Sequence, residues 1–121
     1  ARIAEVALNK MHEEFETEPG DVHAVIGPGI GPSAYQVDAP VFNGFAEKWL
    51  NWERYFDDHR NGRAYVDLVA ANRTLLNDCG VPAAQIGSFD LCTHTLAALF
   101  FSHRRDGLPG GRMFALGMIV K

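Results

Sequence analysis

The sequence predicts an α+β fold, and two features of the chain carry this prediction. Short apolar runs typical of strands are mixed with amphipathic segments typical of helices, without the strict alternation of a doubly wound parallel sheet. The 121 residues include 47% apolar and 21% charged side chains, a composition typical of a globular domain. Because no linker, repeat or low-complexity tract divides the sequence, we expect residues 1–121 to form a single domain or part of one.

The N-terminal third is expected to contain one helix and two short strands. Apolar residues at helical spacing predict an amphipathic helix over residues 1–16, which a Pro-Gly pair ends. These apolar residues are Ile3, Val6, Ala7, Met11 and Phe15. Residues 22–26 form an apolar run typical of a short buried strand, and a Gly/Pro loop at 27–32 separates it from a second strand at 34–37.

The middle third is expected to contain two helices on either side of a strand. Asp38 is a suitable N-cap for a helix. Its predicted apolar face comprises Val41, Phe42, Phe45, Ala46 and Trp49. A polar and aromatic segment at 51–62 ends in an Asn-Gly turn signal, and residues 63–66 follow as a strand. Asp67 is expected to cap a third helix that Gly80 ends. The inward residues of that helix are Leu68, Ala71, Leu75, Leu76 and Cys79.

The last third is expected to end in a long strand. A short helical turn at 82–85 leads into a strand at 86–91, and residues 94–99 are expected to form one helical turn. A Gly/Pro-rich loop at 107–111 precedes the predicted strand at 112–120, which is apolar at nearly every position. Because such a strand needs cover on both faces, we expect another half-domain or a partner chain, including a second copy in a homo-oligomer, to pack here.

Charge and cysteine content exclude several classes of protein. The formal charge of −4 argues against nucleic-acid binding through the overall field. No stretch reaches the ~18 apolar residues of a membrane span, so we expect no membrane association. Cys79 and Cys92 are expected to be reduced thiols of a cytoplasmic protein, because a chain with this much core does not need a disulfide. One disulfide between them is the alternative.

The Gly/Pro loop is the first candidate site. Gly27, Gly29 and Gly31 follow a strand, where glycines let backbone amides approach a phosphate or substrate closely. Their spacing is neither that of a dinucleotide fingerprint nor that of a P-loop, and two prolines remove amide donors. A tight structural crossover is therefore the alternative interpretation.

The second candidate site lies between residues 92 and 112. Arg104 and Arg105 offer planar forks of donors suited to phosphate, and His103 has the chemistry of a general acid or base. Cys92 and Thr93 belong to the same run, and the cationic neighbours would favour a Cys92 thiolate nucleophile. The alternative is a solvated turn in which Arg105 pairs with the next residue.

Metal binding within the chain has weaker support in the sequence. Cys92, His94 and His103 are residue types that bind zinc, but their spacing is not that of a usual zinc site. We therefore expect no metal ligands within residues 1–121.

Three ordered motifs resemble those of the polyphenol-oxidase family, also described as laccase-domain or YfiH-type proteins. The first is similar to an IGPxIG…YEV stretch, the second to a DL…AN helix that ends in Cys-Gly-Val, and the third to a CT…FFSYRRDG…GR signature. They occupy residues 26–31 with 35–37, residues 66–68 with 71–72 and 79–81, and residues 92–93 with 100–107 and 111–112. His103 stands where Tyr is frequent in that family.

The resemblance implies a four-layer α+β fold, of which this chain would be the C-terminal half, and a zinc-dependent purine nucleoside phosphorylase. Phosphorolysis of adenosine and inosine, adenosine deamination and methylthioadenosine phosphorolysis are attributed to such proteins. Older naming makes them copper polyphenol oxidases, which leaves copper as the alternative metal. The family's two His and one Cys ligands come from QVHG, DC and HAGWRG stretches. None of these stretches occurs in the chain, which is expected to begin just after the last of them.

The resemblance therefore implies a division of roles between two halves. The upstream half would hold zinc, which activates a phosphate or water nucleophile. This half would line the pocket for purine nucleoside and phosphate, with Arg104, Arg105 and His103 at the anion and the loop from Gly27 to Gly31 as its floor. The isolated chain is expected to be inactive. A non-catalytic module that associates with the missing half or with itself is the alternative, and a copper oxidase would need more His and Cys clusters than the chain has.

Overall fold

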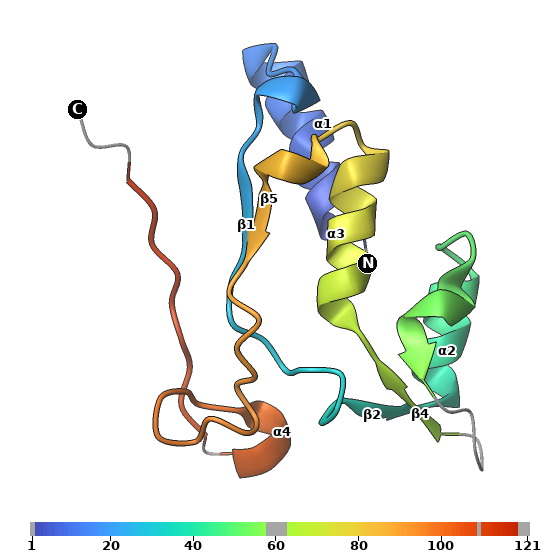
Figure 1. Ribbon diagram of the computed structural model, residues 1–121, viewed down its shortest axis with the longest axis vertical. Helices are drawn as coiled ribbons and strands as arrows, with labels where there is room; N and C mark the ends of the chain where they lie inside the picture. Colours follow the sequence, from blue (N-terminus) through green and yellow to red (C-terminus); the bar gives the residue numbers. More distant parts are fainter. Residues whose placement is uncertain (1, 58–62, 109, 119–121) are drawn as a thin grey trace.

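The computed structural model describes residues 2–57, 63–108 and 110–118, which form two small sheets with helices packed on them (Figure 1). The predicted α+β class is confirmed. The α-helices are α1 (Ile3–Phe15), α2 (Ala39–Ala46), α3 (Leu68–Asp78) and α4 (His103–Asp106). The strands are β1 (Ala24–Ile26), β2 (Gln36–Asp38), β3 (Phe56–Asp57), β4 (Arg63–Val66) and β5 (Ile86–Ser88). Short 3-10 turns are η1 (Pro19–Asp21), η2 (Trp52–Tyr55) and η4 (Ala83–Gln85).

One sheet consists of β1 and β5, which pair in parallel with Ala24 opposite Ile86. Helix α3 contacts both strands, and α1 packs against α3 (Figure 1). The buried residues of this unit are Leu8, Leu76, Val81 and Ile86. Parallel strands are ordinarily covered on both faces, yet Val25 in the middle of β1 is 68% exposed. One face of this sheet is therefore open among the described residues.

Helix α1 confirms the predicted helix, but the side that it buries is not the predicted apolar stripe. Leu8 is buried, and Ala4 packs beside it against α3. All five predicted stripe members are exposed: Ile3, Val6, Ala7, Met11 and Phe15. Apolar periodicity marks the helix, but it does not specify which neighbour covers the stripe, and the described part of the chain supplies cover on one side only.

The other sheet has the order β2-β4-β3, and both pairings are antiparallel. Its core is aromatic: rings of α2 and of the segment after it surround Phe56, with Phe42 and Phe45 each 5.1 Å from it between ring centroids. The predicted inward face of α2 is confirmed except at Ala46, which is exposed. Strand β3 was not predicted, because two residues are too few to show alternation, and the predicted Asn-Gly turn lies outside the described residues.

Helix α3 joins the two units, because it follows β4 of one sheet directly and packs on β1 and β5 of the other. Its start is capped as predicted: the Asp67 side chain accepts a 2.9 Å hydrogen bond from the amide of Ala70. Gly80 follows its end at φ +98°, a conformation that disfavours other residues. The predicted inward residues Ala71, Leu75 and Leu76 are buried.

The C-terminal third differs most from prediction. Residues 111–118 form no strand and run away from the rest of the chain (Figure 1). Phe114 is 92% and Leu116 97% exposed. The strand predicted at 112–120 is therefore wrong over its described part, because a strand needs hydrogen-bonded neighbours and no described segment pairs with it. The helical turn at 94–99 is confirmed in outline, since the amides of Leu96 and Phe100 bond to carbonyls four residues earlier.

Helix α4 was not predicted, because four residues are too few to show helical periodicity. Among the described residues, no helix has the length and apolar character needed to cross a bilayer.

The cap of α3 gives a test of this architecture. Replacing Asp67 with Ala removes a side-chain acceptor at the helix start, and we expect the free energy of unfolding to fall by about 1 kcal/mol in urea denaturation. Asp38→Ala is the matched control, since Asp38 occupies the same position before α2 but accepts no capping hydrogen bond. Equal losses for the two variants would contradict the assignment of the cap.

Candidate functional site

The two loops that follow β1 and β5 lie side by side and build the first part of the site. The amide of Gly29 donates to the carbonyl of Leu91 at 3.2 Å, and the amide of Thr93 donates to the carbonyl of Gly29 at 2.9 Å. The amide of Gly31 donates to Sγ of Cys92 at 3.2 Å. A Cβ atom at Gly31 would lie 3.2 Å from Cβ of Cys92, so the close approach of the loops favours glycine there.

The glycine loop and Cys92 line a shared pocket of about 230 Å³. The predicted residues Gly27, Gly29, Gly31 and Cys92 are therefore brought together, and Asp67 and Asp90 are among the other lining residues. However, the amides of Gly29 and Gly31 already bond within the protein. This geometry favours the structural crossover over a loop that presents these amides to a phosphate.

The two cysteines are free thiols in different environments. Burial is the largest single influence on Cys92 and by itself would raise the pKa of its thiol. Hydrogen bonds from the Thr95 hydroxyl and from the amides of Gly31, Thr95 and His94 together outweigh burial and lower that pKa to about 7. Burial raises the pKa of Cys79. Cys92 is thus the more readily ionised of the two thiols.

Arg105 uses its whole guanidinium group within the protein. Nη1 donates to the carbonyls of Thr93 and His94 at 3.0 and 2.9 Å, and Nη2 donates to the carbonyl of Phe100 at 2.9 Å. Nε and Nη2 also form a two-pronged ion pair with the carboxylate of Asp106 at 2.7 and 2.8 Å. These bonds engage all five N–H donors of an arginine, so the expected anion contact would require at least one of them to break.

Asp106 extends this network to the start of α4. Its Oδ2 accepts a 3.0 Å hydrogen bond from the amide of Ser102, a buried residue. The Arg105 guanidinium, and after it the Ser102 amide, hold the pKa of the Asp106 carboxyl below its usual range. Arg105 therefore pairs with Asp106, as the alternative interpretation of this segment, a solvated turn, expected.

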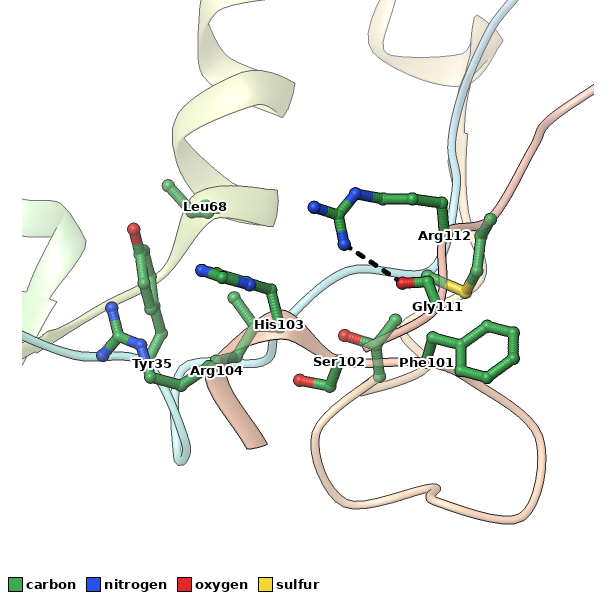
Figure 2. Close-up of a pocket in the computed structure, with 11 residues that line it drawn as sticks. Tyr35, Leu68, Phe101, Ser102, His103, Arg104, Gly111 and Arg112 are labelled. Atoms are coloured by element: carbon green, nitrogen blue, oxygen red, sulfur yellow. Dashed lines mark hydrogen bonds between the residues drawn. The ribbon is translucent and has the colours of Figure 1, made fainter. Parts of the chain in front are cut away.

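A second, larger pocket of about 380 Å³ lies beside α4 (Figure 2). Its polar lining residues are Tyr35, Thr93, Ser102, His103, Arg104 and Arg112. Apolar walls come from residues including Ile30, Leu68, Phe101 and Met113. In Figure 2 the His103 ring and the Arg112 guanidinium reach into the space between Leu68 and Ser102. The pocket thus combines cationic groups with an apolar wall.

Arg104 and Arg112 differ from Arg105 because their donors are not all used. Nη1 of Arg104 donates to the carbonyl of Gln36 at 2.6 Å, and the guanidinium lies 4.8 Å from the centre of the Tyr35 ring. Nη1 of Arg112 donates to the carbonyls of Gly110 and Gly111 at 3.2 and 3.3 Å. Within the described ranges neither arginine forms an ion pair, so both are available to an anion.

The structure thus brings His103, Arg104 and Thr93 into one pocket and places the three glycines and Cys92 in the other. Sequence reasoning missed Tyr35 and Arg112 as lining residues. Both lie within the recognised motifs, but only the fold shows that they face the same space as His103.

The described residues do not form a metal site of their own. No three His, Cys, Asp or Glu side chains among them come together in a way that could hold an ion. Cys92, considered above as a zinc ligand, belongs to no such group, and its sulfur accepts a hydrogen bond from the Gly31 amide.

The environment of Cys92 predicts a distinct reactivity. Alkylation by iodoacetamide, followed by peptide mass spectrometry from about pH 5 to about pH 9, should give a half-maximal rate near pH 7 for Cys92. Thr95→Val removes one donor while keeping a similar shape, and should move that midpoint to higher pH. Cys79 is the internal control and should react only at higher pH. Superimposable profiles for the two thiols would contradict this description.

Comparison with known proteins agrees with the motifs. The sequence model described as multi-copper polyphenol oxidoreductase laccase matches residues 1–120. A purine nucleoside phosphorylase of Bacteroides thetaiotaomicron is 34% identical over 122 residues, which cover 100% of this chain and 45% of that protein. The adenosine deaminase RL5 of an unknown prokaryotic organism is 33% identical, over 93% of this chain and 43% of its own length.

A solved structure supports the same relationship. The crystal structure of YlmD from Geobacillus stearothermophilus matches with a TM-score of 0.80 at 34% identity, over 87% of this chain and 39% of that one. The chain therefore spans less than half the length of these relatives. The three sequence motifs, the fold and these similarities lead to one conclusion: the chain belongs to the multi-copper polyphenol oxidoreductase laccase family, which includes the YfiH- and YlmD-type proteins.

Proposed function

We propose that this chain forms the ligand-pocket part of a longer purine nucleoside phosphorylase, and that it is inactive by itself. The observation that carries the proposal is the pocket beside α4, where Arg104, Arg112 and His103 lie against an apolar wall. Relatives named purine nucleoside phosphorylase or adenosine deaminase support a purine nucleoside as the substrate. The share of those relatives that the chain spans supports a longer protein.

The pocket has the chemistry that phosphorolysis requires. A phosphate oxygen attacks C1′ of the ribose, the C1′–N bond to the purine breaks, and the products are ribose 1-phosphate and the purine base. Arg104 and Arg112 would hold the phosphate by charge-assisted hydrogen bonds and align it with C1′. The departing purine nitrogen needs a proton, which His103 would donate as a general acid. The apolar wall would hold the base.

Zinc dependence is part of the proposal, with ligands from outside residues 1–121. The described side chains do not fit a self-contained metal site, so no step above passes through a metal. Copper in the same outside site is the alternative, and the described donor set offers no cluster that would favour it. Adenosine deamination is an alternative reaction of the same pocket, since the relative named adenosine deaminase matches the chain about as well as the phosphorylases do.

The exposed apolar surfaces support association with the rest of the longer protein. The open face of the β1–β5 sheet, the uncovered side of α1 and residues 111–118 expose large apolar side chains, including Val25, Phe15 and Phe114. Burying them would remove a large apolar area from water. Alternatively, a second copy of the chain would cover these apolar surfaces, and the isolated chain would then be a non-catalytic association module. The free thiols support a cytoplasmic location.

Replacing Arg104 tests the phosphate contact in the longer protein. Arg104→Ala should raise the KM for phosphate about 10- to 100-fold, because a charge-assisted hydrogen bond is lost, and should leave the KM for nucleoside nearly unchanged. Arg54→Ala is a matched control, since Arg54 also lies over a tyrosine ring, 4.9 Å from the centre of Tyr55, but outside the pocket. Unchanged phosphate dependence in Arg104→Ala would rule out the proposed contact.

Metal content tests the proposal that the zinc ligands lie outside residues 1–121. After dialysis against a weak chelator, atomic emission should find no stoichiometric zinc in the 121-residue chain and about one equivalent in the longer protein. Cys92→Ser in the longer protein should leave zinc content unchanged, because among the described residues Cys92 belongs to no group of side chains that could hold an ion. One equivalent in the 121-residue chain, lost on Cys92→Ser, would show a local site and overturn the division.

A further inference from the structure

Arg105 differs from its neighbour Arg104 because all five of its N–H donors bond within the protein. Its five donors reach three backbone carbonyls and one carboxylate, and its side chain is only 24% exposed. By contrast, Arg104 makes one side-chain hydrogen bond among the described residues. Two adjacent arginines of one motif therefore have different surroundings.

The three carbonyls belong to a segment that carries pocket residues. Thr93 lines the larger pocket and is buried, His94 follows it, and Phe100 ends the turn that leads back towards α4. Arg105 lies on α4 itself, between Arg104 and Asp106. Its guanidinium therefore fixes the distance between the 93–94 backbone and the short helix that presents His103 and Arg104.

Asp106 completes this frame. Its carboxylate orients the guanidinium by a two-pronged bond and also accepts the amide of Ser102, another lining residue. A helix of four residues has little stability of its own, so these side-chain bonds define its position. The Thr93 amide, bonded to Gly29, links the frame to the glycine loop.

We infer that Arg105 is a positioning residue. Together with Asp106 it holds the 93–94 backbone and α4 in fixed positions relative to each other, while Arg104 and Arg112 contact the ligand's anion. The inference rests on the proposed function for the identity of the ligand only. The fork of an arginine is required here, because a lysine has three donors on one nitrogen and cannot span three carbonyls and a carboxylate.

Substituting Arg105 and Asp106 one at a time distinguishes a positioning role of Arg105 from direct contact with the anion. If Arg105 contacted phosphate, Arg105→Lys would keep a phosphate-binding charge and affect the phosphate KM alone. Asp106→Asn would then leave phosphate binding unchanged or strengthen it, because a competing carboxylate is neutralised. If Arg105 positions the pocket, both substitutions disturb the same backbone and should have the same effect.

In the longer protein, we expect Arg105→Lys and Asp106→Asn each to lower kcat/KM about 100-fold for nucleoside and phosphate alike, through displacement of reacting groups. The double variant should be no worse than either single variant, since both remove one coupled unit. Arg2→Lys is the matched control: Arg2 also forms a two-pronged pair, with Glu5, and donates to the carbonyl of Lys48, outside both pockets. It should leave both kinetic parameters unchanged.

A second measurement does not depend on the activity. Cys92 directly precedes Thr93 and His94, whose carbonyls Arg105 holds, and His94 and Thr95 are among the residues that lower the pKa of its thiol. Arg105→Lys and Asp106→Asn should therefore both shift the pH midpoint of Cys92 alkylation upward, and Arg2→Lys should not. Circular dichroism checks that each variant is folded, and Asp106→Asn carries the test if Arg105→Lys is not.

Three results are decisive. Equal losses for both variants, with the shifted thiol midpoint, support positioning. A phosphate-only effect of Arg105→Lys, with Asp106→Asn neutral and the thiol midpoint unchanged, overturns it. Absence of phosphorolysis in the unaltered longer protein would contradict the proposed function, and the thiol midpoints would still decide the role of Arg105.

Discussion

The site depends on one constraint, which is the pairing of the two loops that follow the parallel strands β1 and β5. The hydrogen bonds from Gly29 to Leu91 and from Thr93 to Gly29 continue the contact between these strands beyond their ends. The Gly31 amide also donates a hydrogen bond to the Cys92 sulfur. Parallel strands place their carboxyl ends at one edge of a sheet, which is where ligands bind in many α/β arrangements. Arg105 then ties the second of these loops to α4. The pocket beside α4 exists because both connections are made.

The elements set by local signals were predictable from the sequence. The Asp67 cap, the Gly80 stop, the aromatic face of α2 and the strands at 24–26 and 63–66 follow from side-chain chemistry within a few residues. The features set by distant contacts were not predictable. The exposure of the α1 stripe and the absence of the predicted strand over residues 112–118 depend on which segments lie next to them, and periodicity does not carry that information. The two-residue strand β3 and the four-residue helix α4 are too short to show any period.

The candidate site divides in the same way. Residue type and order were enough to select His103, Arg104 and Arg105 as a group, but not to separate them. Only the three-dimensional arrangement shows that Arg105 donates to Thr93, His94, Phe100 and Asp106, while Arg104 makes one side-chain hydrogen bond among the described residues. Likewise, Arg112 joins the pocket through a loop whose path the sequence does not specify. The uncovered apolar surfaces fit the family relationship, because the chain spans less than half of its relatives.

The pocket beside α4 is the proposed binding site of the phosphate. A crystal structure of the longer protein with inorganic phosphate and a purine base tests it most directly. We expect phosphate within hydrogen-bond distance of Arg104 and Arg112, with Arg105 still bonded to the Thr93 carbonyl and to Asp106. Phosphate bound to Arg105, or bound at a place away from His103 and Arg104, would contradict it.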